Sequence, residues 1–456
     1  MKKIIVFLLL TLTVPALAQE EPHRSHRHHS ADGDDDDDEE PEDKTVNSLD
    51  FHESKKQHLR MSSAYSLYLP MSRNGSGTAW LPDASPVYGT MSHTGNWTFM
   101  FQGDIFIRYN AQDLTGKSVR KESKFDAPNM LMFMGQAKVG NYGLFHFNTM
   151  FSGELLTIGS NGYPLLFQTG ETNNGKPLID HQHPHDLFSE LSVSYTQAFS
   201  RKLDAYVYLG YPGEPALGPT AFMHRPSAMF NPDAPLSHHW QDATHISFGV
   251  GTLGIRYGKL KLEGSLFNGR EPDENRGDID ALFLDSRSAR LSFNPTPRWS
   301  FQASRAFLKE PERLHPGNIT RTTASATYSR QFNFRSYLTA TVVGGQNMNG
   351  TTTSNSALAE ASIRITRLIL HSRVEWVQKS AEELGLVRYP SNKLFDISGI
   401  TVGASYELAM VHPLSCAIGW QITANSTPTA LTYIYGDIPV SGQIYLHIYP
   451  ALMRSH

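Results

Sequence analysis

The chain has 456 residues, of which 39% are hydrophobic and 18% charged, with one cysteine and a formal net charge of −4 at pH 7. The single cysteine, Cys416, excludes an internal disulfide framework and a cysteine-based zinc site. No block of the sequence is basic enough to indicate a nucleic-acid partner.

Residues 1–18 have the pattern of a secretory signal peptide. Two lysines precede an apolar run, Ile4 to Leu12, and the small residues Ala16 and Ala18 predict cleavage after Ala18. The apolar run is too short to span a bilayer as a helix, and no later segment reaches about 18 apolar residues. These observations predict export and exclude a multi-helix membrane protein.

Residues 19–60 are low in complexity and highly charged. Residues 19–44 hold twelve acidic and three basic residues, and Asp34 to Glu40 is an unbroken acidic run. Such a segment cannot bury apolar surface, so we predict a disordered periplasmic tail. Its histidines and carboxylates are compatible with weak capture of divalent metal ions, with docking of a periplasmic partner, or with a solvated tail that binds nothing.

Residues 61–95 are rich in Ser, Gly, Pro and Met. They also contain several aromatic residues, among them Tyr65, Trp80 and Tyr88, whose rings need a place to pack. We predict an irregular segment. It either plugs the lumen of the domain that follows, or lines the periplasmic rim of that domain.

From residue 96 onward, apolar and polar residues alternate in segments of about ten residues, which is typical of β-strands. The segments come in pairs, and we count about 16 of them. Seven connections are tight turns, and the eight between them are predicted to be long, for example residues 152–186, 212–243 and 380–394. This arrangement predicts an all-β fold, a transmembrane antiparallel β-barrel over residues 96–456 with short periplasmic turns and long extracellular loops.

The two faces of the predicted strands differ in the way that such a barrel requires. One face is apolar, for example at Leu260, Leu262 and Leu266. The other face carries the charged residues Arg108, Glu190, Lys261, Glu263, Arg290, Arg335, Glu360, Arg364, Arg373, Glu375 and Glu407. A charge facing lipid near the midplane would cost about 2–4 kcal/mol, so this face must line a wet lumen. The alternative, a soluble sandwich or propeller, is disfavoured by the long strands and the two loop lengths.

Histidines gather in the long loops. The segment from Asp180 to Asp186 reads DHQHPHD and stands at the start of a predicted strand, and in an extended chain its three imidazoles point the same way. The next long loop supplies further donors that could converge on them. The candidate metal ligands are His181, His183, His185, Asp186, His224, His238, His239 and His245. Three or four such donors can bind zinc or copper. The alternative is that the histidines hydrogen-bond the loop backbone and form an extracellular cap.

Methionines give a second indication. Met130, Met132 and Met134 alternate on one strand face, with Met100 and Met150 on neighbouring strands. If this face is the lumen, the thioethers favour soft Cu(I). If it faces lipid, the methionines are ordinary apolar residues.

Several loop motifs resemble those of an uncharacterised family of bacterial outer-membrane β-barrel proteins. They lie within residues 70–310 and are SGTAW (76–80), GYPLLFQTGE (162–171), HQHPHD (181–186), GEPALGP (213–219), SHHWQD (237–242) and NGREPD (268–273). The histidine- and methionine-rich chain is also loosely similar to the outer-membrane barrels of copper-resistance systems. The first resemblance implies an outer-membrane barrel, and the second implies the handling of a metal ion.

These observations together predict a Gram-negative outer-membrane barrel, in contact with outer-membrane lipid, that passes or binds a small solute or metal ion. The expected ligand is a divalent or soft metal ion, copper or zinc, and no catalytic residue is assigned. The alternative is a metal-dependent hydrolase at the barrel mouth, where His, Asp and Glu would activate a metal-bound water. The absence of a Gly-x-Ser-x-Gly nucleophile motif favours the first interpretation.

Overall fold

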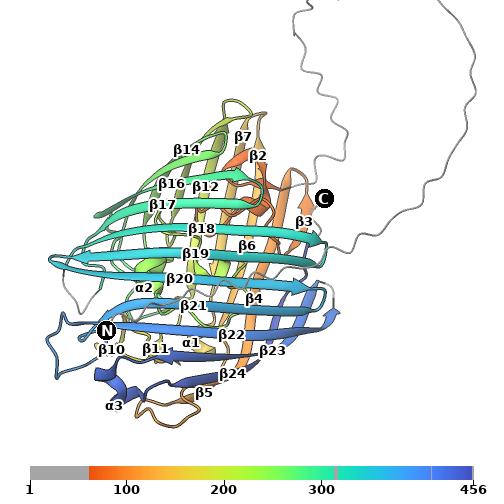
Figure 1. Ribbon diagram of the computed structural model, residues 1–456. Coiled ribbons are helices and arrows are strands. Elements are labelled where there is room, and N and C mark those ends of the chain that lie inside the picture. The colour runs from red at the N-terminus through yellow and green to blue at the C-terminus, as the bar shows by residue number, and fades with distance from the viewer. Residues whose placement is uncertain (1–60, 313–316, 412, 454–456) are drawn as a thin grey trace, which may run out of the picture. The chain divides into compact units, whose positions relative to one another are not determined.

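The computed structural model describes residues 61–312, 317–411 and 413–453, which form a closed antiparallel β-barrel (Figure 1). The predicted signal peptide and the predicted tail, residues 1–60, lie outside the described residues. Within the described ranges, no helix is long and apolar enough to cross a membrane.

The barrel sheet contains eighteen strands, of which β3 (Thr90–Thr94) and β5 (Ser123–Asp126) are short segments beside β4. The other sixteen form the wall, as the sequence predicts. They are β4 (Trp97–Ala111), β6 (Asn129–Val139), β7 (Gly143–Phe151), β12 (Phe188–Ala198), β13 (Leu203–Gly210), β14 (Val250–Tyr257), β15 (Leu260–Phe267), β16 (Ser286–Thr296), β17 (Trp299–Leu308), β18 (Ile319–Asn333), β19 (Ser336–Asn349), β20 (Thr352–Ile365), β21 (Leu368–Ser380), β22 (Leu394–Val411), β23 (Leu414–Ser426) and β24 (Val440–Pro450).

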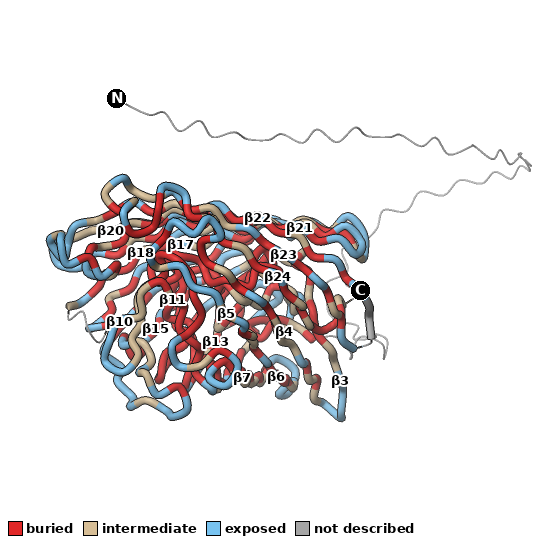
Figure 2. The backbone as a smooth tube through the Cα atoms, turned by 90° about the horizontal axis from the view of Figure 1, so that it is seen from below, coloured by how far each residue is buried: buried red, intermediate tan, exposed pale blue. Residues whose placement is uncertain are grey.

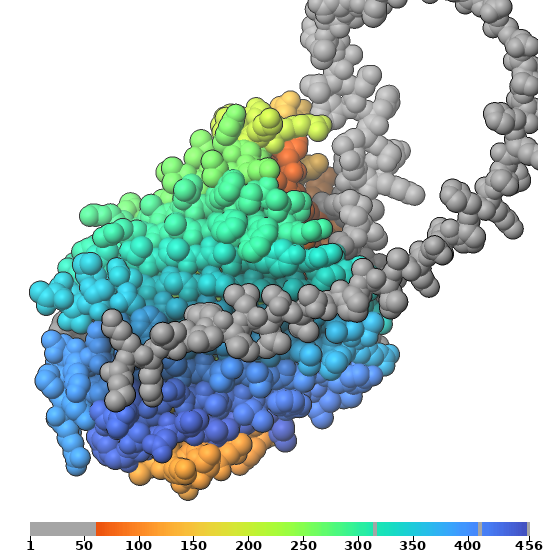
Figure 3. Space-filling model, in the orientation of Figure 1, coloured from red at the N-terminus to blue at the C-terminus, as the bar shows by residue number. Residues whose placement is uncertain are grey.

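The wall closes where the last strand pairs with the first. Residues 442–448 of β24 pair with residues 105–111 of β4, and each other wall strand pairs with its neighbours in the chain. Closure leaves no strand edge with unpaired backbone groups, which is the condition for a sheet to survive in hydrocarbon. In the space-filling view, successive strands pack edge to edge as bands of colour from green to blue (Figure 3).

Alternation along the strands divides apolar from charged side chains. In β15, Leu260, Leu262 and Leu266 are exposed on the outer surface, while Lys261 and Glu263 between them are buried in the interior. Ten of the eleven charged residues predicted to face the lumen are buried. The prediction is wrong for one of them, Arg335, which lies in the turn between β18 and β19, where the alternation of a strand does not apply.

The connections follow the predicted two-sided pattern with one exception. The seven predicted tight turns join their strands at one rim, and seven of the eight connections at the other rim are longer. The exception joins β19 to β20 through residues 350–351 alone. Gly350 adopts φ 56°, a left-handed conformation that glycine takes without strain, and this permits the two-residue turn.

Short elements occupy the segment before the wall and the long loops. They are β1 (Ser62–Ser63), β2 (Ser66–Pro70), η2 (Met71–Arg73), α1 (Glu154–Thr157), β8 (Tyr163–Pro164), β9 (Glu171–Asn173), β10 (Lys176–Leu178), β11 (His181–Gln182), η3 (Phe222–His224), α2 (His238–Gln241), η4 (Ala243–His245), η5 (Thr429–Leu431) and α3 (Thr432–Tyr435).

Residues 61–89, which precede β3, lie against the inner wall. The Thr196 hydroxyl of β12 donates to the carbonyl of Ala64, the Asn294 amide of β16 donates to that of Leu81, and the Ser329 hydroxyl of β18 donates to that of Ala84. Because these partners belong to well-separated wall strands, the segment runs across the interior on the side of the tight turns.

The loop between β13 and β14, residues 211–249, also lies inside the barrel, and we call it the lumen loop. Almost all of it is buried, and Figure 2 shows buried chain inside the ring of wall strands. Asp233 of the lumen loop accepts hydrogen bonds from Arg108 of β4, Gln421 of β23 and Gln443 of β24. Eight strands away from β24 around the wall, Arg290 of β16 donates to the carbonyl of Gly218 in the same loop. The lumen loop is therefore tied to both sides of the interior.

Candidate metal centre

Five of the candidate histidines form one buried group, which we call the imidazole cluster: His183, His185, His238, His239 and His245. The ring centroid of His238 lies 5.2 Å from that of His239 and 5.1 Å from that of His245. His185 lies 5.4 Å from His245, and His183 lies 5.9 Å from His185. The two long loops that precede and follow β12 and β13 thus converge, as the sequence predicts.

Local structure places each ring. The two-residue strand β11 ends at Gln182, so residues 183–186 have no strand partner before β12 begins. Within the lumen loop, the single-turn helix α2 presents His238 and His239, and the following turn η4 presents His245. Helix α2 packs against β18, β19 and β20, and the carbonyl of His239 accepts a hydrogen bond from Asn347 of β19. The wall therefore fixes one half of the imidazole cluster.

Every ring of the imidazole cluster has a hydrogen-bond partner at Nδ1. The partners of His185, His238 and His239 are the carboxyl groups of Glu154 (2.8 Å), Asp242 (2.7 Å) and Glu271 (3.2 Å). The Nδ1 atoms of the remaining two donate to backbone carbonyls, of Pro184 and Asp242. An ionised carboxylate and a carbonyl can only accept, so next to such a partner the proton is on Nδ1, and Nε2 carries the lone pair when the ring is neutral. Burial raises the pKa of Glu271 to about 8, so this carboxyl group can also donate to His239.

The Nε2 atoms are less well satisfied. Those of His185, His239 and His245 are buried and have no hydrogen-bond partner. Nε2 of His183 has only a 3.4 Å contact with Glu171. A buried polar atom without a partner costs about 1–3 kcal/mol, so these three nitrogens are free to accept a bond from a ligand that enters the cluster.

Burial keeps most of these rings neutral. Desolvation lowers the pKa of His238 to about 4, and it lowers the pKa values of His183, His239 and His245 as well. For His185, burial also opposes the charged form, but the Glu154 carboxylate outweighs burial and raises the pKa. Neutral imidazole is the form that binds a metal ion.

Buried charges surround the imidazole cluster. Arg276 pairs with Glu171 at 2.9 Å and with Asp186 at 3.2 Å, and Arg225 pairs with Asp242 at 2.6 Å. Burial raises the pKa of Asp186 to about 6. The carboxylate of Asp186 is therefore directed to Arg276 instead of to the histidines.

The remaining two predicted histidine ligands lie apart from the imidazole cluster. Nδ1 of His181 donates to the carbonyl of Ile179, and its Nε2 lies 3.1 Å from Glu122. His181, His183 and His185 therefore do not converge as expected, and the strand pairing that would hold them in one extended segment ends at Gln182. His224 lines a separate cavity beside the methionines, and burial lowers its pKa to about 4.

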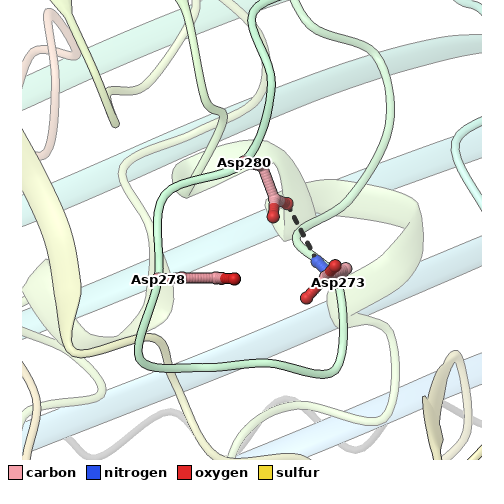
Figure 4. A group of neighbouring side chains, drawn as sticks. All are labelled: Asp273, Asp278 and Asp280. Atoms are coloured by element: carbon pink, nitrogen blue, oxygen red, sulfur yellow. Dashed lines mark hydrogen bonds between the residues drawn. The ribbon is translucent and has the colours of Figure 1, made fainter.

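Within the described ranges, one set of three or more His, Cys, Asp or Glu residues has ligand atoms all within 4.8 Å of one another: Asp273, Asp278 and Asp280 (Figure 4). These side chains lie in the loop between β15 and β16, and two of them are exposed. The Asp273 backbone N–H donates to Asp280, and the Asn275 amide donates to Asp278, which accounts for the arrangement as a loop structure. The nitrogens of the imidazole cluster are more widely spaced, so binding an ion there requires the rings to move inward.

Sequence reasoning missed the carboxylates that orient the imidazoles. Glu154, Glu171 and Glu271 come from three separate places in the chain, and none stands in a recognisable spacing with its histidine. Two of them lie within or beside the resembling loop motifs, since Glu171 ends GYPLLFQTGE and Glu271 belongs to NGREPD. Those motifs were the available signal.

No protein-family model and no curated protein matches the chain. The barrel is similar to solved porins: the anion-selective porin of Comamonas acidovorans (11% identity, TM-score 0.48, 78% of this chain and 100% of the porin) and Salmonella typhi OmpF in complex with daunomycin (10%, 0.49, 79% and 99%). A loop-deletion mutant of Vibrio cholerae OmpT is similar at 7% identity and a TM-score of 0.46, over 78% of this chain and 100% of OmpT. These likenesses are too distant to carry an argument, and the fold class rests on the strand pairing described above.

Proposed function

We propose that this chain is a bacterial outer-membrane barrel that binds a divalent transition-metal ion, zinc or copper, in its filled lumen. One observation carries the proposal: the imidazole cluster holds five buried rings with Nδ1 directed to fixed hydrogen-bond partners, and three of their Nε2 atoms are buried without a partner. Metal-ligating histidines almost always donate their other ring N–H to a carboxylate or a carbonyl. A role as an extracellular cap alone would not account for the unpaired nitrogens.

The outer surface of the wall supports a location in a membrane. Its exposed side chains are large and apolar on every side, including Leu253 of β14, Val374 of β21 and Ile444 of β24. A soluble protein rarely exposes so much contiguous apolar surface. A closed barrel of sixteen strands with this surface fits the outer membrane of a Gram-negative bacterium.

The filled interior supports binding in preference to free diffusion of solutes. The lumen loop is fixed to the wall by the buried pairs of Asp233 with Arg108 and of Arg225 with Glu360. Breaking such a pair by removing one partner costs about 3–5 kcal/mol. A solute that crosses the barrel must therefore displace the lumen loop or pass through sites that the lumen loop helps to form.

A zinc titration of the purified full-length protein in detergent tests the proposal. In the triple variant His185→Ala, His239→Ala and His245→Ala, we expect the affinity for Zn(II) to fall by at least about 100-fold, because all three unpaired nitrogens are removed. Isothermal titration calorimetry against a competing chelator measures the change. The single variant His245→Ala, which is easier for the fold to accept, should lose at least about tenfold.

The matched control is His181→Ala. His181 belongs to the same sequence motif but lies outside the imidazole cluster, so its removal should leave the Zn(II) affinity unchanged. Heat-dependent migration of the barrel on gels verifies that each variant is folded. Equal Zn(II) affinity for the wild type and a folded triple variant would overturn the proposal and favour the capping role.

A further inference from the structure

Methionines form a second concentrated group inside the barrel. The chain has 14 methionines, and ten of them belong to one contact cluster. The six buried ones are Met61, Met100, Met130, Met132, Met134 and Met150. Among the residues that the structure describes, Val87 is the one other buried or partly buried apolar member of this cluster.

The pattern of β6 shows that this face is the lumen. Met130, Met132 and Met134 are buried, while Leu131 and Phe133 between them are each 42% exposed on the outer surface. In the sheet, Met134 pairs with Met100 of β4, and Met132 pairs with Met150 of β7. The thioethers of three neighbouring strands therefore gather on one part of the inner wall.

These thioethers border a cavity of about 130 Å³, which we call the methionine cavity. Met100, Met130, Met132 and Met134 line it from the wall, and Met223 lines it from the lumen loop. A water molecule occupies about 30 Å³ in the liquid, so the cavity has room for an ion together with a few waters. The methionine cavity lies on the inner side of the wall, and the surrounding side chains do not fill it.

Polar groups in the methionine cavity point to a cation. His146 of β7 is buried there, and its Nε2 has no hydrogen-bond partner. His224 and the carboxylate of Asp104 also line the cavity. The unpaired imidazole nitrogen and the oxygens of Asp104 offer ligand atoms to a cation.

The composition of the group distinguishes ligation from packing. An apolar contact of this size is ordinarily made of Leu, Ile, Val and Phe, because their rotamers are well defined and burying Met costs more side-chain entropy. Met is the one uncharged apolar side chain that offers a soft donor to a metal ion, and thioethers select Cu(I) over harder divalent ions. A cluster of ten methionines and one valine has the composition expected for metal ligation and not the one expected for packing.

We propose that the methionine cavity binds a soft monovalent metal ion, Cu(I) or its analogue Ag(I), through thioethers and the imidazole of His146. This site is separate from the imidazole cluster and belongs to other residues, so either proposal can fail without the other. His224 borders the methionine cavity and is close enough to His185 for the two rings to interact electrostatically. The two sites are therefore neighbours along the lumen.

The test uses Ag(I), which cannot be oxidised in air as Cu(I) can. All variants carry Cys416→Ser, because the one thiol of the chain would otherwise bind silver. Met100→Leu, Met132→Leu and Met134→Leu are combined, since Leu keeps the volume and apolar character of Met but has no sulfur. We expect the Ag(I) affinity of the full-length protein to fall by at least about tenfold.

Two controls separate the possible causes. Met348→Leu removes a methionine of β19 that is outside the cluster and should leave the Ag(I) affinity unchanged. The imidazole-cluster triple variant should lose Zn(II) binding but keep Ag(I) binding. X-ray absorption of the Cu(I)-loaded protein should show sulfur neighbours that disappear in the methionine variant. Unchanged Ag(I) affinity in a folded methionine variant, or loss of Ag(I) binding with the imidazole variant alone, would overturn the inference.

Discussion

Glu154 shows how a single side chain prepares an imidazole. Its carboxylate oxygen accepts from both the backbone N–H and Nδ1 of His185, each at 2.8 Å. This double contact holds the ring in one orientation and one tautomer, with Nε2 directed away. Loss of such an orienting partner typically weakens metal binding 10- to 100-fold, even though the ligand itself remains.

We therefore predict that Glu154→Gln lowers the Zn(II) affinity by about 10- to 100-fold. The amide retains the shape and one acceptor but loses the negative charge that polarises the ring. The number of ions bound at saturation should stay the same, which distinguishes a positioning role from the loss of a ligand. Glu122→Gln is the control, because Glu122 lies beside His181, outside the imidazole cluster. Calorimetry gives both quantities in one titration.

Among the elements, the lumen loop depends most on long-range contacts. Asp233 accepts from side chains of three wall strands, β4, β23 and β24, with donor–acceptor distances of 2.6 Å in each case. Removal of this carboxylate leaves Arg108 with Asp126 as its remaining carboxylate partner. The backbone carbonyls of Pro232 and Phe230, which accept from Arg108 and Tyr445, would then be what holds this part of the lumen loop to that side of the wall.

We predict that Asp233→Ala raises the single-channel conductance measured in planar bilayers, because the lumen loop can leave the ion path more often. Asp278→Ala, an exposed substitution in another long loop, should leave the conductance at the wild-type level. A conductance for Asp233→Ala equal to that of the wild type would mean that the lumen loop stays in place without this anchor.

The strands and the loops differ in how far the sequence predicts them. The wall strands can be predicted because apolar and charged residues alternate along them. A charge on the outer face of β15 would be costly, so Lys261 can only point inward. The inward fold of the lumen loop carries no such periodicity, because its position depends on partners such as Glu360 that are remote in the chain. The turn at Gly350 was missed because the polar residues around it resemble a longer loop.

The sequence also predicts the candidate site only in outline. His183, His185 and the lumen-loop histidines could be grouped because their loops flank one hairpin, β12 and β13. The divergence of His181 depends on where β11 ends, which a one-residue shift would change. The convergence of carboxylates on the rings is a tertiary property, and no local spacing encodes it.

For the whole molecule, the two rims predict opposite exposure in a cell. Lys176 of β10 lies in a long loop, and Lys202 lies in the tight turn between β12 and β13. In a Cys416→Ser background, Lys176→Cys should react with a membrane-impermeant maleimide on intact cells, and Lys202→Cys should react only after the cells are opened. The reverse labelling pattern would place the long loops in the periplasm.

The pairing of β4 with β24 also constrains the order in which the molecule can be assembled. The first wall strand finds its second partner only when the last one is in place, so the cylinder stays open as a curved sheet until the final step. Residues 61–89 and the lumen loop are hydrogen-bonded to the inside of that cylinder at β12, β16 and β20. Their contacts are therefore made by the assembled cylinder and not by any single hairpin.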